Sequence, residues 1–293
     1  MGAVTMSSRL PSRPVADVRG VRIPHGTLAL LRDLVSAHTG MYYDDVRVDT
    51  LADRLTPLAL ARGFDSLLDY YYLLKYDARP EDWAHAIDAL SVHETYFWRE
   101  ADQFTALTTT ILPRLTAMHQ RPIRIWSLPC STGEEPLSLA IALTEAGSFS
   151  RTPIEIFAAD ASHSALARAR AGRYGRRAFR QLPETLRARY FEPGPGAGEW
   201  TVSPAIHDRI TSWQQLNAAQ RDHLARLRGA DVIFCRNLFI YFQEPTVRRV
   251  VEGFADEMST PGYLCVGAAE SLLRITRRFD LQDVGGAYVY VKV

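Results

Sequence analysis

The chain has 293 residues, of which 47% are hydrophobic and 23% are charged, and its formal net charge at pH 7 is +1. This balance argues against a protein held on nucleic acid by many phosphate contacts, so we expect no nucleic-acid partner. No apolar run reaches the roughly 18 residues that a membrane span requires, and no signal-peptide core is visible, so we expect a cytoplasmic protein without direct membrane insertion.

The first third of the chain predicts a tail and a helical domain. Residues 1–20 lack apolar periodicity, and we expect a flexible tail there. From residue 21 to 90 apolar side chains recur at helical spacing, with Gly40 and Gly63 at expected helix ends. The four stripes comprise Leu28, Leu31, Leu34 and Val35; Leu51, Leu55, Leu58 and Leu60; Leu67, Leu68, Tyr71, Tyr72 and Leu74; and Trp83, Ile87 and Leu90.

From residue 91 to 293 strand-like runs alternate with helical segments. Such alternation predicts a parallel sheet with helices on both faces, that is, an α/β domain of Rossmann-like type. The turn signal Gly285-Gly286 and the run 288–293 predict a terminal strand pair, which suits a class I methyltransferase better than a dehydrogenase. The expected strands are 123–128, 154–159, 232–235 and 263–266, and the expected helices are 136–146, 162–171 and 245–258.

One segment, from about residue 173 to 212, interrupts this alternation. It is rich in arginine and then carries the sequence PGPGAG at 193–198, a pattern typical of a turn between strands. We expect a small β-subdomain inserted between elements of the sheet. The arginines at about 168–180 are more typical of a solvated face than of a docking patch.

The segment IRIWSLPCSTGEEP, residues 123–136, predicts a buried strand, a loop of small residues and a helix start. This is how a Rossmann-like sheet makes room for a nucleotide-sized ligand. Glu134 and Glu135, however, stand where a pyrophosphate would bind, so the loop favours a cationic ligand such as S-adenosylmethionine. The alternative is that two carboxylates in a first helical turn only complement the helix dipole.

Two further strand ends carry polar side chains. Asp160 ends the run IFAAD, where an acid can accept both ribose hydroxyls of an adenosyl group; alternatively it caps the next helix. Arg236, Asn237 and Tyr241 follow the apolar run DVIFC, at the edge where ligands bind in open α/β sheets, and we expect a functional role for them. The alternative is one more apolar strand followed by a surface arginine.

The segment SVHETYFWRE, residues 91–100, joins the two expected domains. Arg99 is either a rim residue packed on aromatic rings or a fixed guanidinium that grips a carboxylate. His93 shows no pattern of a general base or a metal ligand. The three cysteines, Cys130, Cys235 and Cys265, have no C-x-x-C spacing, so we expect reduced thiols, no disulfide and no metal.

The segments SVHETYFWRE, IWSLPCSTGEEP, FAADASHSALARARAGRY and FCRNLFIYF, in this order and spacing, closely resemble the chemotaxis-receptor methyltransferases, the CheR family of protein-glutamate O-methyltransferases. The resemblance runs from about residue 25 to the C-terminus. It implies a helical domain, a Rossmann-like methyltransferase domain that binds S-adenosyl-L-methionine and releases S-adenosyl-L-homocysteine, and a small inserted β-subdomain. It also implies a cofactor-binding set of His93, Thr95, Arg99, Glu135, Asp160, Asn217, Ala218, Arg236 and Asn237.

By the same resemblance Arg99 and Tyr241 lie beside the transferring methyl group, and the substrate is the cytoplasmic domain of a methyl-accepting chemotaxis receptor. We expect a monomer. The chain departs from the family at His93, where many members have Asn, and near Glu270, which lacks the preceding His-Ser. The turn at 193–198 is also slightly short, which leaves docking of a receptor's C-terminal peptide open.

Other functions remain compatible with the sequence. A non-catalytic adaptor that binds S-adenosylmethionine would keep the cofactor set. A methyltransferase acting on a different protein or on a small carboxylate is another alternative, although a small substrate would not obviously require the helical domain. A DNA or RNA amino-methyltransferase would show an N/D-P-P-Y/F run, and CRNLFIYF stands there instead.

Overall fold

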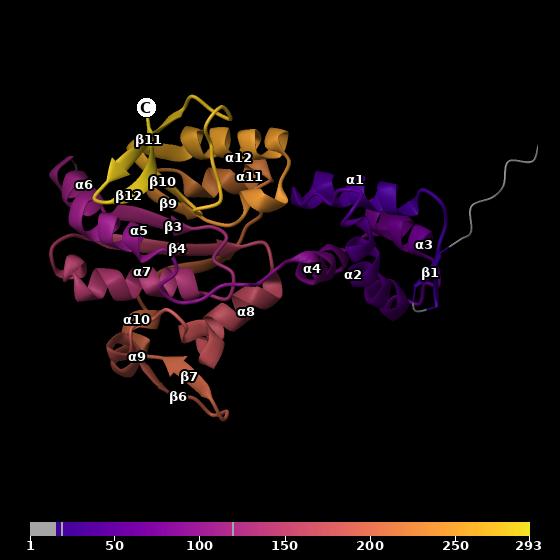
Figure 1. Cartoon of the computed structure of the whole chain (residues 1–293), viewed down its shortest axis with the longest axis horizontal. Coiled ribbons are helices and arrows are strands. Elements are labelled where there is room, and N and C mark those ends of the chain that lie inside the picture. Colours follow the sequence, from indigo (N-terminus) through magenta and orange to yellow (C-terminus); the bar gives the residue numbers. More distant parts are fainter. Residues whose placement is uncertain (1–15, 19, 119) are drawn as a thin grey trace, which may run out of the picture. The chain divides into compact units, whose positions relative to one another are not determined.

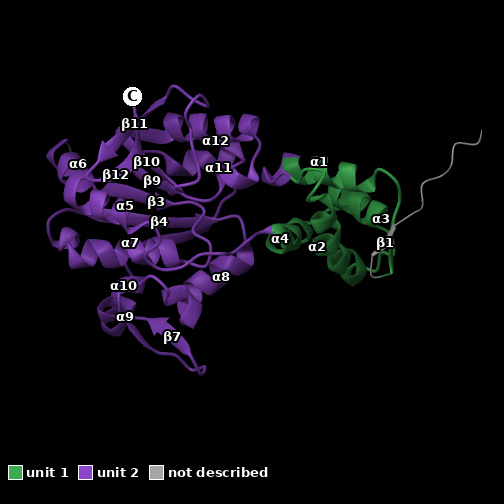
Figure 2. Cartoon of the chain, in the orientation of Figure 1, with its two compact units in different colours: residues 1–36, 43–90 green, residues 37–42, 91–293 purple. Residues whose placement is uncertain are grey.

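The computed structural model describes residues 16–18, 20–118 and 120–293, which form two compact units (Figure 2). The smaller unit holds the described residues up to Ser36 together with Tyr43–Leu90, and the larger holds Ala37–Tyr42 and Ser91–Val293. Most of the expected tail lies outside the described residues. Its end is structured, because strand β1 (Ala16–Val18) pairs antiparallel with β2 (Val21–Ile23).

The smaller unit is helical apart from this strand pair, as expected. Leu31, Leu51 and Leu55 from the expected stripes are fully buried, whereas Leu60 is 46% exposed. Leu60 lies five residues beyond Leu55, and at 100° per residue this turns its side chain about 140° away from the buried stripe. The helices are α1 (Thr27–Thr39), α2 (Val48–Ala61), α3 (Leu67–Tyr72), the π-helix η1 (Leu73–Asp77) and α4 (Pro80–Leu90).

The larger unit is built on a seven-stranded sheet with the order β11-β12-β10-β9-β3-β4-β8 (Figure 1). The five strands from β10 to β8 run parallel, and β12 and β11 are added antiparallel at one edge, which confirms the expected terminal strand pair. The strands are β3 (Ile123–Ser127), β4 (Ile154–Asp160), β8 (Ile210–Gln215), β9 (Ala230–Cys235), β10 (Met258–Val266), β11 (Phe279–Val284) and β12 (Ala287–Lys292).

Helices cover both faces of this sheet because side chains alternate along buried strands. Ile125 and Phe234 face one hydrophobic core with α5, α6 and α7, and their neighbours Trp126 and Ile233 face a second core with α11 and α12. The helices are α5 (Ala101–Ala106), the π-helix η2 (Leu107–Ile111), α6 (Leu112–Met118), α7 (Glu134–Glu145), η3 (Ser148–Ser150), α8 (His163–Ala171), α11 (Arg221–Leu224), η5 (Ala225–Leu227), η6 (Phe239–Tyr241) and α12 (Glu244–Glu257).

The insertion forms a separate three-stranded antiparallel sheet with the order β5-β7-β6. The PGPGAG stretch makes the expected turn, closed by the Gly194 N–H, which donates to the Glu199 carbonyl at 2.8 Å. Strand β8 pairs parallel with β4, so the inserted sheet ends before Ile210, earlier than the expected limit of 212. The elements are β5 (Arg173–Gly175), η4 (Arg176–Phe179), α9 (Glu184–Tyr190), β6 (Phe191–Pro193), β7 (Glu199–Val202) and α10 (Pro204–His207).

Residues 37–42 belong to the larger unit, although the sequence placed them in the helical domain. The Tyr42 N–H donates to the Tyr241 carbonyl at 2.9 Å. Gly40 has φ of +84°, and a Cβ there would lie 2.7 Å from the Ala219 Cβ and 2.9 Å from the Phe242 ring, so only glycine fits this close approach. Across the described residues, no helix is both long and apolar enough to cross a membrane.

Candidate functional site

The loop after β3 brings two acidic side chains to the carboxyl end of the sheet. The Ser127 hydroxyl, at the end of β3, donates to Glu135 Oε1 at 2.6 Å, and the Thr132 hydroxyl donates to Glu134 Oε2 at the same distance. Both glutamates are buried in the first turn of α7. Burial raises the pKa of Glu134.

Asp160, at the end of the neighbouring strand β4, fixes the shape of this loop. Its Oδ2 accepts the Ser131 N–H and its Oδ1 accepts the Ser162 N–H, both at 2.8 Å. The carboxylate is 6% exposed. An ionised carboxylate has about four lone-pair positions, so it can accept several hydrogen bonds at once. Ser162, rather than Asp160, caps α8.

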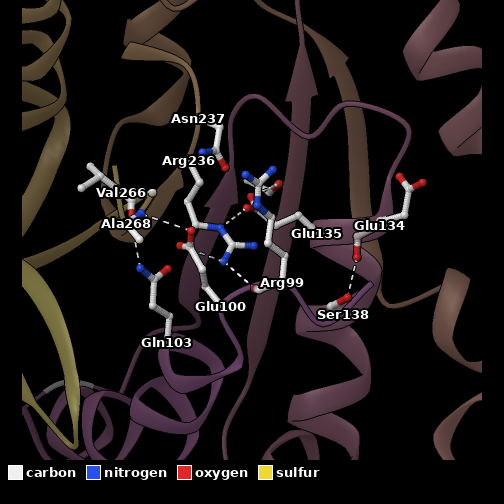
Figure 3. A network of polar contacts seen from close by, with 12 residues as sticks. Arg99, Glu100, Gln103, Glu134, Glu135, Ser138, Arg236, Asn237, Val266 and Ala268 are labelled. Atoms are coloured by element: carbon white, nitrogen blue, oxygen red, sulfur yellow. Dashed lines mark hydrogen bonds and ion pairs between the residues drawn. The ribbon is translucent and has the colours of Figure 1, made fainter. Parts of the chain in front are cut away.

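Arg236 follows β9 and is held by groups from two distant segments (Figure 3). Its Nε donates to Glu135 Oε2 at 2.6 Å, and its Nη1 donates to the Arg99 carbonyl at 2.6 Å and lies 3.5 Å from Glu100 Oε2. Burial alone would lower the pKa of the guanidinium, but Glu135 and Glu100 raise it above its ordinary value. Arg236 is therefore a permanent buried cation with its Nη2 left for other contacts.

Asn237 is placed by a carboxylate that the sequence did not assign to the site. Asn237 has φ of +59°, a left-handed conformation that asparagine tolerates better than most residues. Glu270 accepts its N–H at 2.8 Å and those of Phe239 and Gly267 at 2.7 Å. Burial raises the pKa of Glu270, and these backbone N–H groups oppose the shift. Glu270 thus shapes the loop after β9.

Two residues with left-handed backbones flank Arg99: Trp98, with φ of +68°, and Glu100, with φ of +53°. Such conformations cost of order 1–3 kcal/mol for larger residues and cluster at ligand sites. Glu100 is held by Arg236 and by the Ala268 N–H, which donates to it at 3.1 Å. The half-buried Arg99 guanidinium lies 5.4 Å from the centre of the Tyr96 ring.

These segments enclose a hollow of about 60 Å³ at the carboxyl ends of β3 and β9. Two water molecules occupy a similar volume in the liquid, so this hollow can take one end of a ligand. A second hollow, of about 590 Å³, shares Val92, Glu94 and Thr95 with it. The small hollow is lined by Val92, Glu94, Thr95, Arg99, Pro129, Cys130, Ser131, Glu135, Arg236 and Asn237.

Five of the residues that the sequence assigned to cofactor binding line the small hollow: Thr95, Arg99, Glu135, Arg236 and Asn237. His93 lines the larger one, with its Nε2 3.4 Å from the Ser162 hydroxyl. Asp160 lies directly behind Ser131 and does not line either hollow.

Three other assigned residues also lie outside the linings of these two hollows: Tyr241, Asn217 and Ala218. The Asn217 side chain serves the fold, because its Nδ2 donates to the His38 carbonyl at 3.1 Å and its Oδ1 accepts the Ala219 N–H at 2.9 Å. Ala218 beside it is buried. Asp160 at the end of β4 pairs with Gln215 at the end of β8. Asn217 follows Gln215 by two residues, so it remains next to Asp160 at the sheet edge.

Sequence reasoning missed Ser127, Glu100 and, as a loop-shaping acid, Glu270. Ser127 could have been found, because a serine that ends an apolar strand points a hydroxyl at the ligand edge. No local sequence pattern indicated Glu100, since its partner Arg236 lies 136 positions further along the chain.

The donor set fits S-adenosylmethionine. Carboxylates suit its ammonium group, guanidinium N–H groups suit its carboxylate, and a carboxylate such as that of Asp160 can accept ribose hydroxyls. Among the described residues, the buried Ser131 hydroxyl in the wall of the small hollow has no hydrogen-bond partner, as expected of a group that meets a ligand.

In the part of the chain that the structure describes, no group of three or more His, Cys, Asp or Glu could hold a metal ion. Cys130, Cys235 and Cys265 are free and buried, as expected from their spacing, and burial raises the pKa of each thiol.

Comparisons with known proteins agree with this architecture. A family model described as the all-alpha domain of CheR methyltransferase matches residues 27–91, and one described as its SAM binding domain matches residues 93–285. The expected fold class is thereby confirmed: a helical domain, then a Rossmann-like α/β domain that binds S-adenosylmethionine.

Curated relatives align over most of the chain. It is 32% identical to "Chemotaxis protein methyltransferase 2" of Vibrio cholerae serotype O1, over 89% of this chain and 91% of that protein. It is 34% identical to "Chemotaxis protein methyltransferase 1" of Pseudomonas aeruginosa, over 70% of this chain and 75% of that protein. It is 33% identical to "Probable biofilm formation methyltransferase WspC" of Pseudomonas putida, over 86% of this chain but 58% of that longer protein.

Proposed function

The chain belongs to the CheR methyltransferase family, and we propose that it transfers a methyl group from S-adenosylmethionine to glutamate side chains of a chemoreceptor cytoplasmic domain. The products are glutamate methyl esters and S-adenosylhomocysteine. The observation that carries this proposal is the convergence of Glu135, Arg99 and Arg236 on one hollow at the ligand edge of the sheet. We expect the protein to act as a cytoplasmic monomer.

The site residues would hold different parts of the cofactor and of the substrate. Arg236, held by Glu135 and Glu100, is oriented before any ligand arrives, so little ordering is required on binding. Among the described residues, the Arg99 guanidinium makes one long hydrogen bond, of 3.4 Å from its Nη1 to the Glu94 carbonyl, and lies against the Tyr96 ring, so it is available to a carboxylate. Asp160 would accept the ribose hydroxyls.

The chemistry requires orientation more than acid–base catalysis. S-adenosylmethionine supplies a methyl group activated by a positively charged sulfur. When bound, it would offer this methyl carbon to the substrate oxygen, and the electron pair of the broken carbon–sulfur bond would stay on its sulfur. An exposed glutamate has a pKa of about 4.3 and is already ionised at neutral pH, so no general base is needed. Arg99 and Tyr241 would align the carboxylate by hydrogen bonds, and alignment of this kind lowers the barrier.

The direct test is incubation with labelled S-adenosylmethionine and purified receptor cytoplasmic domains. Receptors from a chemotaxis system and from a biofilm-associated system should both be offered, because relatives carry both names. Base-labile label located on glutamate by mass spectrometry is the expected result. Receptor variants with glutamine at the labelled positions are the matched control. Tight S-adenosylhomocysteine binding with no transfer to any receptor would refute the proposal and favour an adaptor.

A further inference from the structure

The larger hollow, which shares residues with the small one, has several arginines in its lining. Its volume of about 590 Å³ lies in the range of sites that bind ligands. Glu94, Thr132 and Glu134 line it together with the arginine set, which comprises Arg168, Arg173, Arg176, Arg177 and Arg180. Five guanidinium groups therefore face two carboxylates.

The segment that carries four of these arginines is firmly anchored. Tyr174 is buried and its hydroxyl donates to the Thr132 carbonyl at 2.9 Å. The Phe97 N–H donates to the Ala178 carbonyl at 2.8 Å, and the Phe97 ring packs on Tyr174 and Phe179 with centroid distances of 4.8 and 5.3 Å. With Tyr174, Ala178 and Phe179 turned inward, the intervening arginines point outward from a rigid base.

The guanidinium groups of the arginine set differ in their contacts. Arg180 lies 3.4 Å from Glu94 Oε1 and stacks on the Tyr96 ring at 3.7 Å. Within the described residues, no side-chain hydrogen bond or ion pair involves the other four members of the set. Arginines elsewhere on the larger unit, such as Arg189 and Arg278, are paired with carboxylates.

The acids in the lining do not neutralise this charge. Glu134 is buried, accepts the Thr132 hydroxyl, and has its pKa raised by that burial, with Arg168 and Arg180 opposing the shift. Glu94 is 72% exposed and faces Arg180 alone among the set. The hollow therefore keeps a net positive field next to the cofactor site, with which it shares Val92, Glu94 and Thr95.

From this arrangement we propose that the arginine-lined hollow docks acidic side chains of the protein substrate that flank the glutamate to be methylated. The inference rests on the proposed function and names a substrate-recognition subsite for it. Guanidinium groups bind carboxylates in bidentate fashion, and several on one rigid segment select an acidic stretch over a single charge. The exposed field also attracts an acidic surface before contact.

The test is the double charge reversal Arg176→Glu with Arg177→Glu. Its matched control is Arg226→Glu with Arg277→Glu, two exposed arginines outside the lining whose reversal changes the net charge equally. We expect the KM for a receptor cytoplasmic domain to rise at least about tenfold in the hollow variant and to stay within about twofold in the control. The affinity for S-adenosylhomocysteine, measured by calorimetry, should be unchanged in both. Equal KM values for the two variants would overturn the proposal.

A binding assay separates this inference from the proposed function. A fluorescein-labelled oligoglutamate peptide should bind the wild-type chain, lose affinity with added salt, and bind the hollow variant at least about tenfold more weakly; an oligoglutamine peptide should not bind. Equal peptide affinity in the two proteins, or stronger binding of a single-stranded oligonucleotide, would overturn the docking inference. If the wild-type chain methylates no receptor, the proposed function fails, and the peptide assay still decides the docking inference.

Discussion

The buried pair between Glu135 and Arg236 should contribute to both the stability of the larger unit and cofactor binding, and Glu135→Gln separates charge from shape. The two side chains are 8% and 2% exposed, and Glu135 Oε2 lies 2.6 Å from Arg236 Nε. Glutamine has the same length and retains an oxygen that can accept from Arg236 or Ser127. The substitution therefore removes a negative charge and leaves a buried cation.

The size of the effect follows from the remaining contacts of Arg236. Breaking a buried ion pair by removing one partner typically costs about 3–5 kcal/mol. Here Arg236 keeps the Arg99 carbonyl at 2.6 Å and Glu100 at 3.5 Å, so the lower end applies, and we expect a loss of about 3 kcal/mol in the free energy of unfolding. Typical domains have about 5–15 kcal/mol, so the variant should still fold.

Urea denaturation followed by tryptophan fluorescence measures this loss, because four of the five tryptophans lie in the larger unit. The control is Glu244→Gln, which removes an exposed pair with Arg248 and should cost less than about 0.5 kcal/mol. Calorimetry should show that Glu135→Gln binds S-adenosylhomocysteine at least about tenfold more weakly than the wild-type chain, whereas Glu244→Gln should not show this loss. The reasoning would be refuted by a variant that unfolds at the same urea concentration as the control and binds the cofactor product normally.

Other substitutions test the site in different ways. Arg99→Ala and Tyr241→Phe should each lower turnover on a receptor domain by about 100-fold while the unfolding free energy changes by less than about 1 kcal/mol; initial rates near the wild-type value would contradict their roles. Because burial raises the pKa of Glu134, its contribution to stability is full below its ordinary pKa of 4.5 and is lost as the pH rises through the higher folded pKa. Glu134→Gln should therefore flatten the decline in unfolding free energy above pH 4.5, and an unchanged pH profile would disprove this assignment. Gly133→Ala should destabilise the chain by more than about 1 kcal/mol in thermal melts, because Gly133 has φ of +99° and a Cβ would lie 2.8 Å from the Tyr174 hydroxyl; a melting temperature equal to that of the wild type would contradict it.

The strands of the parallel sheet could be predicted because each is a short apolar run bounded by turn residues. β3 and β4 match their expected ranges to within one residue. β10 begins at Met258 instead of 263, because its first part includes a register shift and mixed polar residues that hide the strand pattern. The strand pair at 16–23 was missed for a similar reason, since three-residue strands show no periodicity.

Candidate site residues could be predicted where a strand ends, because the carboxyl ends of parallel strands meet at one edge. Glu135, Asp160 and Arg236 were found in this way. What each side chain contacts could not be predicted. Asn217 was assigned to the cofactor, but its amide also holds the carbonyl of His38, 179 residues away.

By itself, the sequence determined the order of elements, the acidic loop after β3, and the family motifs, since these depend on local patterns. Only the tertiary structure decided which charges neutralise one another. It paired Arg236 with Glu135 and Glu100. It also left Arg168, Arg173, Arg176 and Arg177 facing a hollow, where their guanidinium groups have no hydrogen bond or ion pair with any described residue. Charge pairing depends on distances of a few ångströms between segments far apart in the chain, and those distances exist only once the sheet has formed.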